Sequence, residues 1–159
     1  MSRAPVSRVR ARVDIDAPPA AVFTFFDDLA NAPVLVPGLV EVVSVEPRPD
    51  GGRHVAYTIR ARDGNLVDAS SEHLEHRPPE RTVTRGVQSG VETRSIREFL
   101  PLADGRTRVV TTVEWSVPIR YVGALVTAPL RGPLRRSIRA AHATAKQRLE
   151  SGPASLTPP

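Results

Sequence analysis

Hydrophobic and polar residues alternate strictly near the start of the chain. Between residues 9 and 15 every odd position is apolar and every even position is charged. A period of two residues is typical of a strand with one buried face. We therefore predict a half-buried strand from Val9 to Ile15.

A helical pattern follows this strand. Pro18 and Pro19 supply the backbone φ of a first helical turn, and Val22 and Phe26 follow four residues apart. Prolines then interrupt residues 30–39. This segment predicts a second short helix and a loop.

From Glu41 onward the pattern predicts a meander of six strands, because strand-like segments alternate with turn signals. The turn signals are Asp50-Gly51-Gly52, Asp63-Gly64, Pro78-Pro79, Ser89-Gly90 and Asp104-Gly105. After Pro118 the apolar residues take the spacing of one helical stripe. The stripe consists of Leu134, Ile138, Ala141, Ala145 and Leu149. We therefore predict an α+β fold in which a curved, seven-stranded antiparallel sheet wraps around a long C-terminal helix. Two short helices are expected after the first strand.

Length and composition narrow the class of protein. The 159 residues suit one domain, which we assign to residues 6–150. We expect residues 1–5 and 151–159 to be disordered, because the last nine residues have little to bury. No apolar run approaches the roughly 18 residues of a membrane span, and the N-terminus lacks the apolar stretch of a signal peptide, so we expect a cytoplasmic protein. The chain has no cysteine, which excludes disulfides and thiol chemistry.

The basic residues are compatible with an anionic partner but do not define one. The formal charge is +5. With 4% aromatic residues and no recognised nucleic-acid motif, we expect no nucleic-acid partner. A basic row lies at helical spacing, one residue around from the apolar stripe, and we expect it to face outward. It consists of Arg131, Arg135, Arg139, His142 and Lys146. Such a row can rest on an anionic membrane, or it can be a solvated face with no partner.

Small side chains on the helix and the strands leave room for a cavity between them. The helix carries Ala140, Ala141, Ala143 and Ala145 near the predicted sheet. A packed core would favour larger residues at several strand positions, namely Ala61, Ala69, Ser71 and Thr111. The alternative is that helix and sheet approach more closely over these small residues and leave no cavity.

The stretch IDAPPAAVFTFFDDLANAPVLVPG from Ile15 to Gly38, followed after Leu39 by VEVVSVE, carries a family resemblance. It resembles the opening of the START-like SRPBCC superfamily, especially its polyketide cyclase/dehydrase and lipid-transport branch. The order of predicted elements is similar to the helix-grip fold of that family. The resemblance implies a cavity under the long helix that binds lipids, polyketides, sterols or quinones. We expect no cofactor.

Strand register decides which side chains face this cavity, because a slip of one residue turns every side chain over. At Asp63-Gly64, a three-residue bulged turn places one alternating set inside, whereas the other register would bury Asp68 and Glu72. We choose the first register, which directs inward Val67, Ala69, Ser71 and His73. The same turn at Asp104-Gly105 directs inward Phe99, Arg97 and Ser95, opposite Thr111, Val113 and Trp115.

Four polar residues are candidates for chemistry in this apolar cavity: His73, Tyr57, Arg97 and Ser71. His73 can act as a general acid or base near neutral pH. Tyr57 and Arg97 can polarise a carbonyl or enolate oxygen, as an aldol-type cyclisation requires. Alternatively, His73 and Tyr57 are hydrogen-bonded packing residues and Arg97 points to solvent. The predicted ligand contacts are Phe26, Leu39, Tyr57, Ile59, Val67, Ala69, Ser71, His73, Phe99, Thr111, Val113, Trp115, Leu134, Ile138 and Ala141.

This chain differs from the aromatase/cyclase members of the family at three positions of one predicted strand. The strand from Leu66 to Leu74 resembles one that carries tryptophans and an arginine toward the cavity in those proteins. Here Val67 and Ala69 stand at the tryptophan positions and His73 at the arginine position. The departure argues against polyketide aromatisation and favours ligand binding without turnover.

We expect no metal site and no catalytic carboxylate pair. His73 and His76 lie three apart on a predicted strand and would face opposite sides of the sheet, and His54 has no evident partner. Asp27 and Asp28 are expected to cap the turn after the first helix and to meet solvent.

The favoured function is therefore the binding of a hydrophobic small molecule between sheet and helix, for carriage or transfer. A cyclase/dehydrase-like enzyme that uses the cavity histidine, tyrosine and arginine is one alternative. A membrane-surface interaction module that uses the basic row is another.

Overall fold

The computed structural model describes residues 6–116 and 128–151, and its elements follow the predicted order. The strands are β1 (Val6–Ile15), β2 (Leu39–Pro47), β3 (Arg53–Arg60), β4 (Leu66–Arg77), β5 (Arg81–Gln88), β6 (Val91–Pro101) and β7 (Thr107–Ser116). The helices are α1 (Pro19–Asp27), the one-turn η1 (Leu29–Asn31), α2 (Ala32–Leu35) and α3 (Ala128–Glu150). The ends that we expected to be disordered lie outside the described residues, except for Ser151, whose N–H donates to the carbonyl of Gln147 at 3.1 Å.

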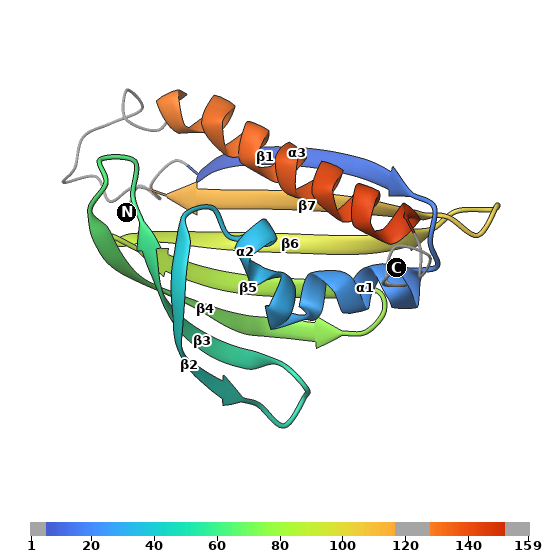
Figure 1. Ribbon diagram of the computed structural model, residues 1–159, viewed down its shortest axis with the longest axis horizontal. Helices are drawn as coiled ribbons and strands as arrows, with labels where there is room; N and C mark the ends of the chain where they lie inside the picture. Colours follow the sequence, from blue (N-terminus) through green and yellow to red (C-terminus); the bar gives the residue numbers. More distant parts are fainter. Residues whose placement is uncertain (1–5, 117–127, 152–159) are drawn as a thin grey trace, which may run out of the picture.

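The seven strands form one antiparallel sheet in the order β1-β7-β6-β5-β4-β3-β2. Strands β2 to β7 pair with their neighbours in the chain, and β1 lies beside β7. The sheet twists, and the helices lie over one of its faces (Figure 1). This is the predicted helix-grip arrangement, in which the sheet and α3 form two layers.

The two bulged turns have the predicted form. The N–H of Ala61 donates to the carbonyl of Asn65 at 2.8 Å, and Gly64 adopts a positive φ of 86°. An equivalent bond of 2.8 Å joins Leu102 to Arg106. A glycine with positive φ at the end of a three-residue hairpin loop is typical of a bulged turn. Both hairpins therefore present the predicted alternating residues to the helices.

Two apolar clusters hold the helices against the sheet. The first joins α1 and the C-terminal half of α3 to the sheet, and consists of Ile15, Val22, Phe23, Phe26, Phe99, Val109 and Ala145. The second lies under the middle of α3 and consists of Val9, Ala11, Trp115 and Ile138. The predicted stripe of α3 faces inward, but Ala140 and Ala143 are exposed. They were wrongly predicted to face the sheet, because each successive residue is rotated by about 100° around a helix.

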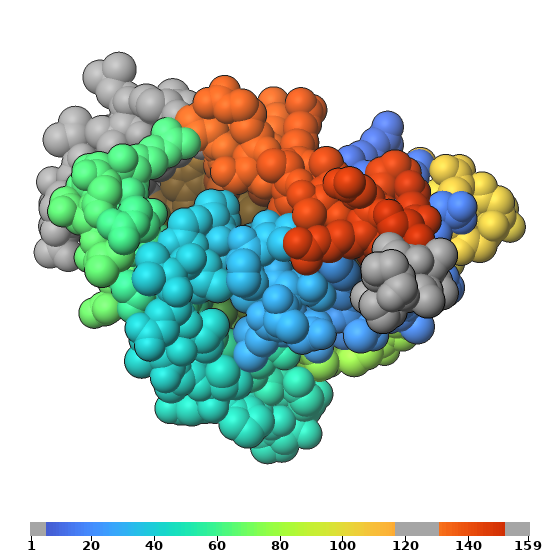
Figure 2. Space-filling view, in the orientation of Figure 1, coloured from blue at the N-terminus to red at the C-terminus, as the bar shows by residue number. Residues whose placement is uncertain are grey.

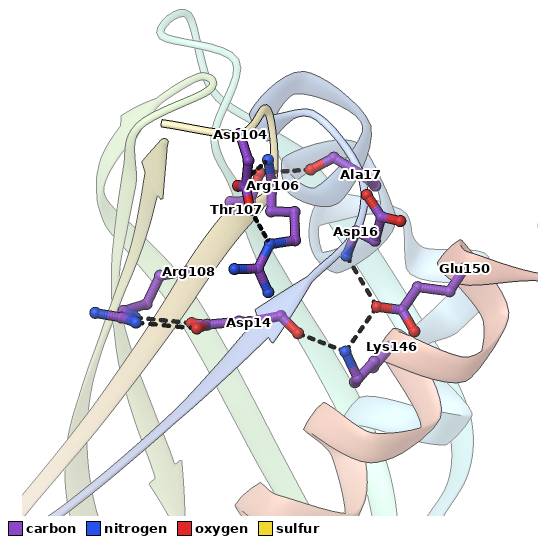
Figure 3. A network of polar contacts seen from close by, with 9 residues as sticks. All are labelled: Asp14, Asp16, Ala17, Asp104, Arg106, Thr107, Arg108, Lys146 and Glu150. Carbon is purple, nitrogen blue, oxygen red and sulfur yellow. Dashed lines mark hydrogen bonds and ion pairs between the residues drawn. The ribbon is translucent and has the colours of Figure 1, made fainter. Parts of the chain in front are cut away.

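Polar contacts fasten the C-terminal end of α3 to the end of β1 (Figure 3). The Nζ of Lys146 donates to the carbonyl of Asp14 at 2.7 Å and lies 2.6 Å from Oε1 of Glu150. That carboxylate oxygen also accepts the N–H of Asp16 at 2.9 Å. Lys146 was predicted to belong to an outward basic row, but its long side chain reaches back to the strand.

No helix among the described residues is long and apolar enough to cross a membrane.

Candidate functional site

A large hollow of about 600 Å³ lies between the sheet and the N-terminal half of α3. Its apolar wall includes Ile59, Val113, Trp115, Leu134, Ile138 and Ala141. Figure 2 shows its opening between α3 and the turn after β3. Further along α3, Ala145 is fully buried against the sheet. The two alternatives for the small residues of this helix therefore both occur, with open space at Ala141 and close packing at Ala145.

A small hollow of about 230 Å³ lies under α1 and α2 and adjoins the large one. The two hollows share seven lining residues, which are Phe26, Leu35, Val36, Tyr57, Thr93, Ser95 and Arg97. Several polar residues line only the small hollow, among them Asp27, Arg53, His73, Thr82 and Thr84. Both hollows thus have mostly apolar walls, and the small one under α1 adds the carboxylates of Asp27 and Asp28.

The predicted ligand contacts are distributed over both hollows. Phe26 and Tyr57 line both of them, while Leu39, Ser71, His73 and Phe99 line the small one. The large hollow is lined by Ile59, Thr111, Val113, Trp115, Leu134, Ile138 and Ala141. Val67 and Ala69 were predicted to contact the ligand but line neither hollow. Their strand partners Ile59 and Tyr57 have larger side chains, which form the wall at that level.

Arg97 projects from β6 at the junction of the two hollows instead of pointing to solvent. Its Cζ lies 4.8 Å from the centre of the Phe26 ring. Its Nε is buried and has no hydrogen-bond partner among the described residues. Burial lowers the pKa of Arg97 to about 10, against a smaller opposing effect of the Asp27 carboxylate. The guanidinium therefore remains charged at neutral pH.

His142 also faces the large hollow, which corrects its predicted place in the outward basic row. Its side chain follows Ile138 by one helical turn, is 3% exposed, and its Nε2 lies 2.8 Å from Oγ1 of Thr111. Burial and the charge of Arg97 lower the pKa of His142 to about 4, so the ring is neutral at pH 7. The exposed members of the predicted row are Arg131, Arg135 and Arg139.

Tyr57 projects from β3 into both hollows. Burial raises the pKa of its hydroxyl, because the phenolate form would lose its hydration. The hydroxyl is therefore protonated at neutral pH and can donate a hydrogen bond to a ligand oxygen.

A cluster of Asp27, His73 and His76 corrects two further predictions. A bulge in β4 between His73 and Glu75 inserts one extra residue, so both histidines face the helices although they lie three apart. His76 Nε2 lies 3.1 Å from Oδ2 of Asp27, and His73 Nε2 lies 3.8 Å from its Oδ1. Asp27 thus faces the histidines instead of solvent, whereas Asp28 caps the next turn by accepting the N–H of Ala30, as predicted.

The ligand atoms of these three residues lie within 4.8 Å of one another, which raises the question of a metal ion. The backbone N–H of Arg53 donates to Nδ1 of His73 at 3.1 Å, so the neutral ring carries its proton on Nε2, the atom that faces Asp27. A histidine that binds metal instead donates its remote N–H to an acceptor. The guanidinium of Arg53 also lies 3.6 Å from the carboxylate of Asp27. This arrangement fits a hydrogen-bonded carboxylate-imidazole cluster better than a metal site.

The protonation of His73 follows from its surroundings. Burial and the charge of Arg53 lower the pKa of His73, while the carboxylate of Asp27 raises it by a smaller amount. The ring is therefore neutral at pH 7, with its Nε2–H toward the carboxylate. The sequence did not predict that Asp27 and His76 share a site with His73. The bulge in β4 that turns His76 toward Asp27 involves no glycine or proline that would have indicated it. Sequence reasoning also missed His142, although the four-residue step from Ile138 was a usable signal.

The comparisons with known proteins agree with this architecture. The family model described as "Polyketide cyclase / dehydrase and lipid transport" matches residues 7–150. A search of curated proteins gave no match. Among solved structures, TTHA0849 from Thermus thermophilus is 24% identical with a TM-score of 0.68, and the alignment covers 91% of this chain and 98% of that one.

Two di-domain ARO/CYC proteins have a similar fold. BexL from the BE-7585A biosynthetic pathway is 21% identical with a TM-score of 0.72, over 91% of this chain and 50% of BexL. StfQ from the steffimycin biosynthetic pathway is 16% identical with a TM-score of 0.69, over 90% of this chain and 51% of StfQ. Because the family model spans nearly the whole domain, including β1, α3 and every strand between them, this chain belongs to the polyketide cyclase/dehydrase and lipid transport family.

Proposed function

We propose that this protein binds a hydrophobic small molecule in the large hollow, for carriage or transfer. The observation that carries the proposal is a space of about 600 Å³ with an apolar wall under α3. Small-molecule sites typically have volumes of about 300–1,000 Å³ and mostly apolar walls with a few polar groups. Membership in a family whose description includes lipid transport also supports an apolar ligand.

Filling the hollow from α3 tests this proposal. Ala141 lines the hollow, and Ala143 lies two residues further along the same helix with an exposed side chain, so it is a matched control. The neutral fluorophore N-phenyl-1-naphthylamine is titrated into the wild type, Ala141→Phe and Ala143→Phe. We expect the probe to change the emission of Trp115, the one tryptophan of the chain, which lines the same hollow.

Ala141→Phe should weaken probe binding by about tenfold or more, because the added ring occupies the space or forces the helix outward. Ala143→Phe should bind like the wild type. Equal affinity of all three proteins would show that the apolar ligand does not lie under α3, and the proposal would fail.

A cyclase/dehydrase-like enzyme is the second candidate function. The observation that favours it is the pair formed by Asp27 and His73 in the small hollow, with Tyr57 and Arg97 on the adjoining wall. The Oδ1 of Asp27 is buried and lacks a hydrogen-bond partner among the described residues, which leaves it able to accept a proton. A carboxylate that accepts a proton beside a fixed cation is suited to enolate chemistry.

In an aldol-type cyclisation, Asp27 would take the proton from a carbon between two carbonyl groups, and the electron pair would move to the carbonyl oxygen near Arg97. The enolate carbon would then form the new carbon-carbon bond with a second carbonyl. Tyr57 would protonate the resulting alkoxide and would regain a proton from Asp27 through water. His76, 3.1 Å from Oδ2 of Asp27, would hold the carboxylate in place, and the Nε2–H of His73, 3.8 Å from Oδ1, would face the oxygen that takes the proton.

Binding and turnover separate this candidate from a carrier. If the site is catalytic, Asp27→Asn and His73→Ala should lower kcat on a poly-β-ketone substrate by about a hundredfold or more, with little change in affinity. Asp28→Asn, also on the wall of the small hollow but bonded to the N–H of Ala30, is the control for a lost charge and should retain most of the turnover. An absence of turnover by the wild type, or equal turnover by the wild type and Asp27→Asn, would argue for a carrier.

A further inference from the structure

Arg97 is a half-buried cation with a fully buried Nε, and it makes no ion pair among the described residues. The acids closest to it in space or sequence are engaged elsewhere, since Asp27 pairs with Arg53 and His76, and Glu98 pairs with Arg81. A charge removed from water is costly unless it is paired and hydrogen-bonded. The guanidinium makes a cation-π contact with Phe26, but a ring face does not accept its N–H groups in the way that an oxygen does.

The Asp27 carboxylate acts on Arg97 through its charge, but no ion pair joins Arg97 to an acid among the described residues. The Nε of Arg97 is buried without a hydrogen-bond partner among the residues described, and so is the Nε1 of Trp115, four residues beyond Thr111 on the wall of the same hollow. Tyr57 keeps its proton, and His142 is neutral because burial and Arg97 lower its pKa to about 4. Buried donors that lack partners mark a place where an acceptor from outside the protein is missing.

We propose that Arg97 recognises the carboxylate of an otherwise apolar ligand, so that the large hollow takes an amphipathic organic acid. This inference rests on the proposed function and adds the chemical class of the ligand. The planar guanidinium presents two parallel N–H groups that match the two oxygens of a carboxylate. The apolar chain of the acid lies along Trp115, Leu134 and Ile138, away from the carboxylates under α1.

A matched acid and alcohol test the charge requirement. Dodecanoate and dodecanol, both below their aggregation limits at pH 7.5, compete with N-phenyl-1-naphthylamine for the wild type, Arg97→Met and Arg94→Met. Arg94 lies on the same strand, but its side chain is exposed, which makes it a suitable control. We expect dodecanoate to displace the probe from the wild type and from Arg94→Met at a concentration about tenfold or more below that of dodecanol.

Arg97→Met should lose this preference while it still binds the probe and dodecanol. Arg97→Lys retains the charge without the two-pronged geometry, so it should keep part of the preference. Thermal unfolding provides a measurement that does not depend on the probe. Without ligand, Arg97→Met should unfold at a higher temperature than the wild type, because an unpaired, half-buried charge is removed. Dodecanoate should raise the unfolding temperature of the wild type more than that of Arg97→Met.

Two outcomes would overturn the inference but leave hydrophobic binding intact. One is equal displacement of the probe from the wild type by acid and alcohol, and the other is an unchanged acid preference in Arg97→Met. If the probe, dodecanoate and dodecanol all fail to bind the wild type, the proposed function fails, and the carboxylate inference fails with it.

Discussion

The Oγ1 of Thr111 and the Nε2 of His142 lie 2.8 Å apart and join β7 to α3 inside the large hollow. The other ring nitrogen of His142 is buried and lacks a hydrogen-bond partner among the described residues. The ring is therefore a polar group on the wall of the large hollow, held by one hydrogen bond, on the helix that covers this hollow. Its protonation would add a second buried positive charge beside Arg97.

His142 should make the protein less stable in mild acid. The pKa of His142 is about 4 in the folded state and about 6.5 in an unfolded chain, so the unfolded state binds more protons between these values. The contribution of a neutral His142 is fully present above pH 6.5 and is lost as the pH falls toward 4, by up to about 3 kcal/mol. His142→Gln should reduce this loss, measured by urea unfolding at pH 7.5, 5.5 and 4.5.

The matched control for this prediction is His54→Gln. His54 lies on β3, is partly exposed and lines neither hollow, so this variant measures the effect of losing a histidine away from the large hollow. If His142→Gln and the wild type lose equal free energy of unfolding between pH 7.5 and 4.5, the assignment of a neutral buried His142 is wrong.

Asp27 should set the pKa of His73. The carboxylate raises the pKa of His73 against the lowering effects of burial and Arg53, so Asp27→Asn should lower that pKa further. Titration of the His73 ring protons by NMR measures the change. Asp28→Asn is the control, because asparagine retains the side-chain oxygen that accepts the N–H of Ala30. A His73 pKa that stays constant or rises in Asp27→Asn contradicts the cluster geometry.

Gly52 should be required for the position of His73. A Cβ at Gly52 would lie 2.8 Å from the Cβ of His73, closer than real side-chain atoms approach. We expect Gly52→Ala to lower the free energy of unfolding by about 1–3 kcal/mol and to shift the His73 ring signals. At Gly132, on α3, the nearest atom to an added Cβ is the Nη1 of Arg136 at 3.8 Å. Gly132→Ala should therefore stabilise the helix by up to about 1 kcal/mol, and a loss of stability at both sites would point to a general intolerance of alanine.

Lys146 should hold the end of α3 on β1. Lys146→Ala removes the bond to the Asp14 carbonyl and the contact with Glu150, which are partly exposed, so we expect a loss of about 1 kcal/mol. Amide hydrogen exchange in the last two turns of α3 should speed up more than exchange in β7. Arg148→Ala, two residues away on an exposed position, should change stability by less than about 0.5 kcal/mol. Equal exchange rates in Lys146→Ala and the wild type would remove the role assigned to these contacts.

The alternation of apolar and polar residues, together with the residue types at the turns, was sufficient to predict the order of the elements and the register of two hairpins. The strand from Val9 to Ile15 follows from its period of two. The register that places Tyr57 opposite Ala69 follows from a three-residue turn closed by Gly64. These features are local, since each depends on residues a few positions apart, so the element order, the inward strand faces and most of the cavity wall could be predicted.

Only the tertiary structure decided where open space lies under α3 and which polar side chains meet in the two hollows. Whether a small residue of α3 means open space, as at Ala141, or close packing, as at Ala145, depends on how deep the whole helix sits on the sheet. The bulge that brings His73 and His76 to Asp27 exists only in the pairing of β4 with β5. Among the described residues Arg97 has no ion-pair partner, which depends on the side chains that the other elements place around it. Such features depend on residues that are distant in the chain. The periodicity of the sequence is a local property and therefore could not predict them.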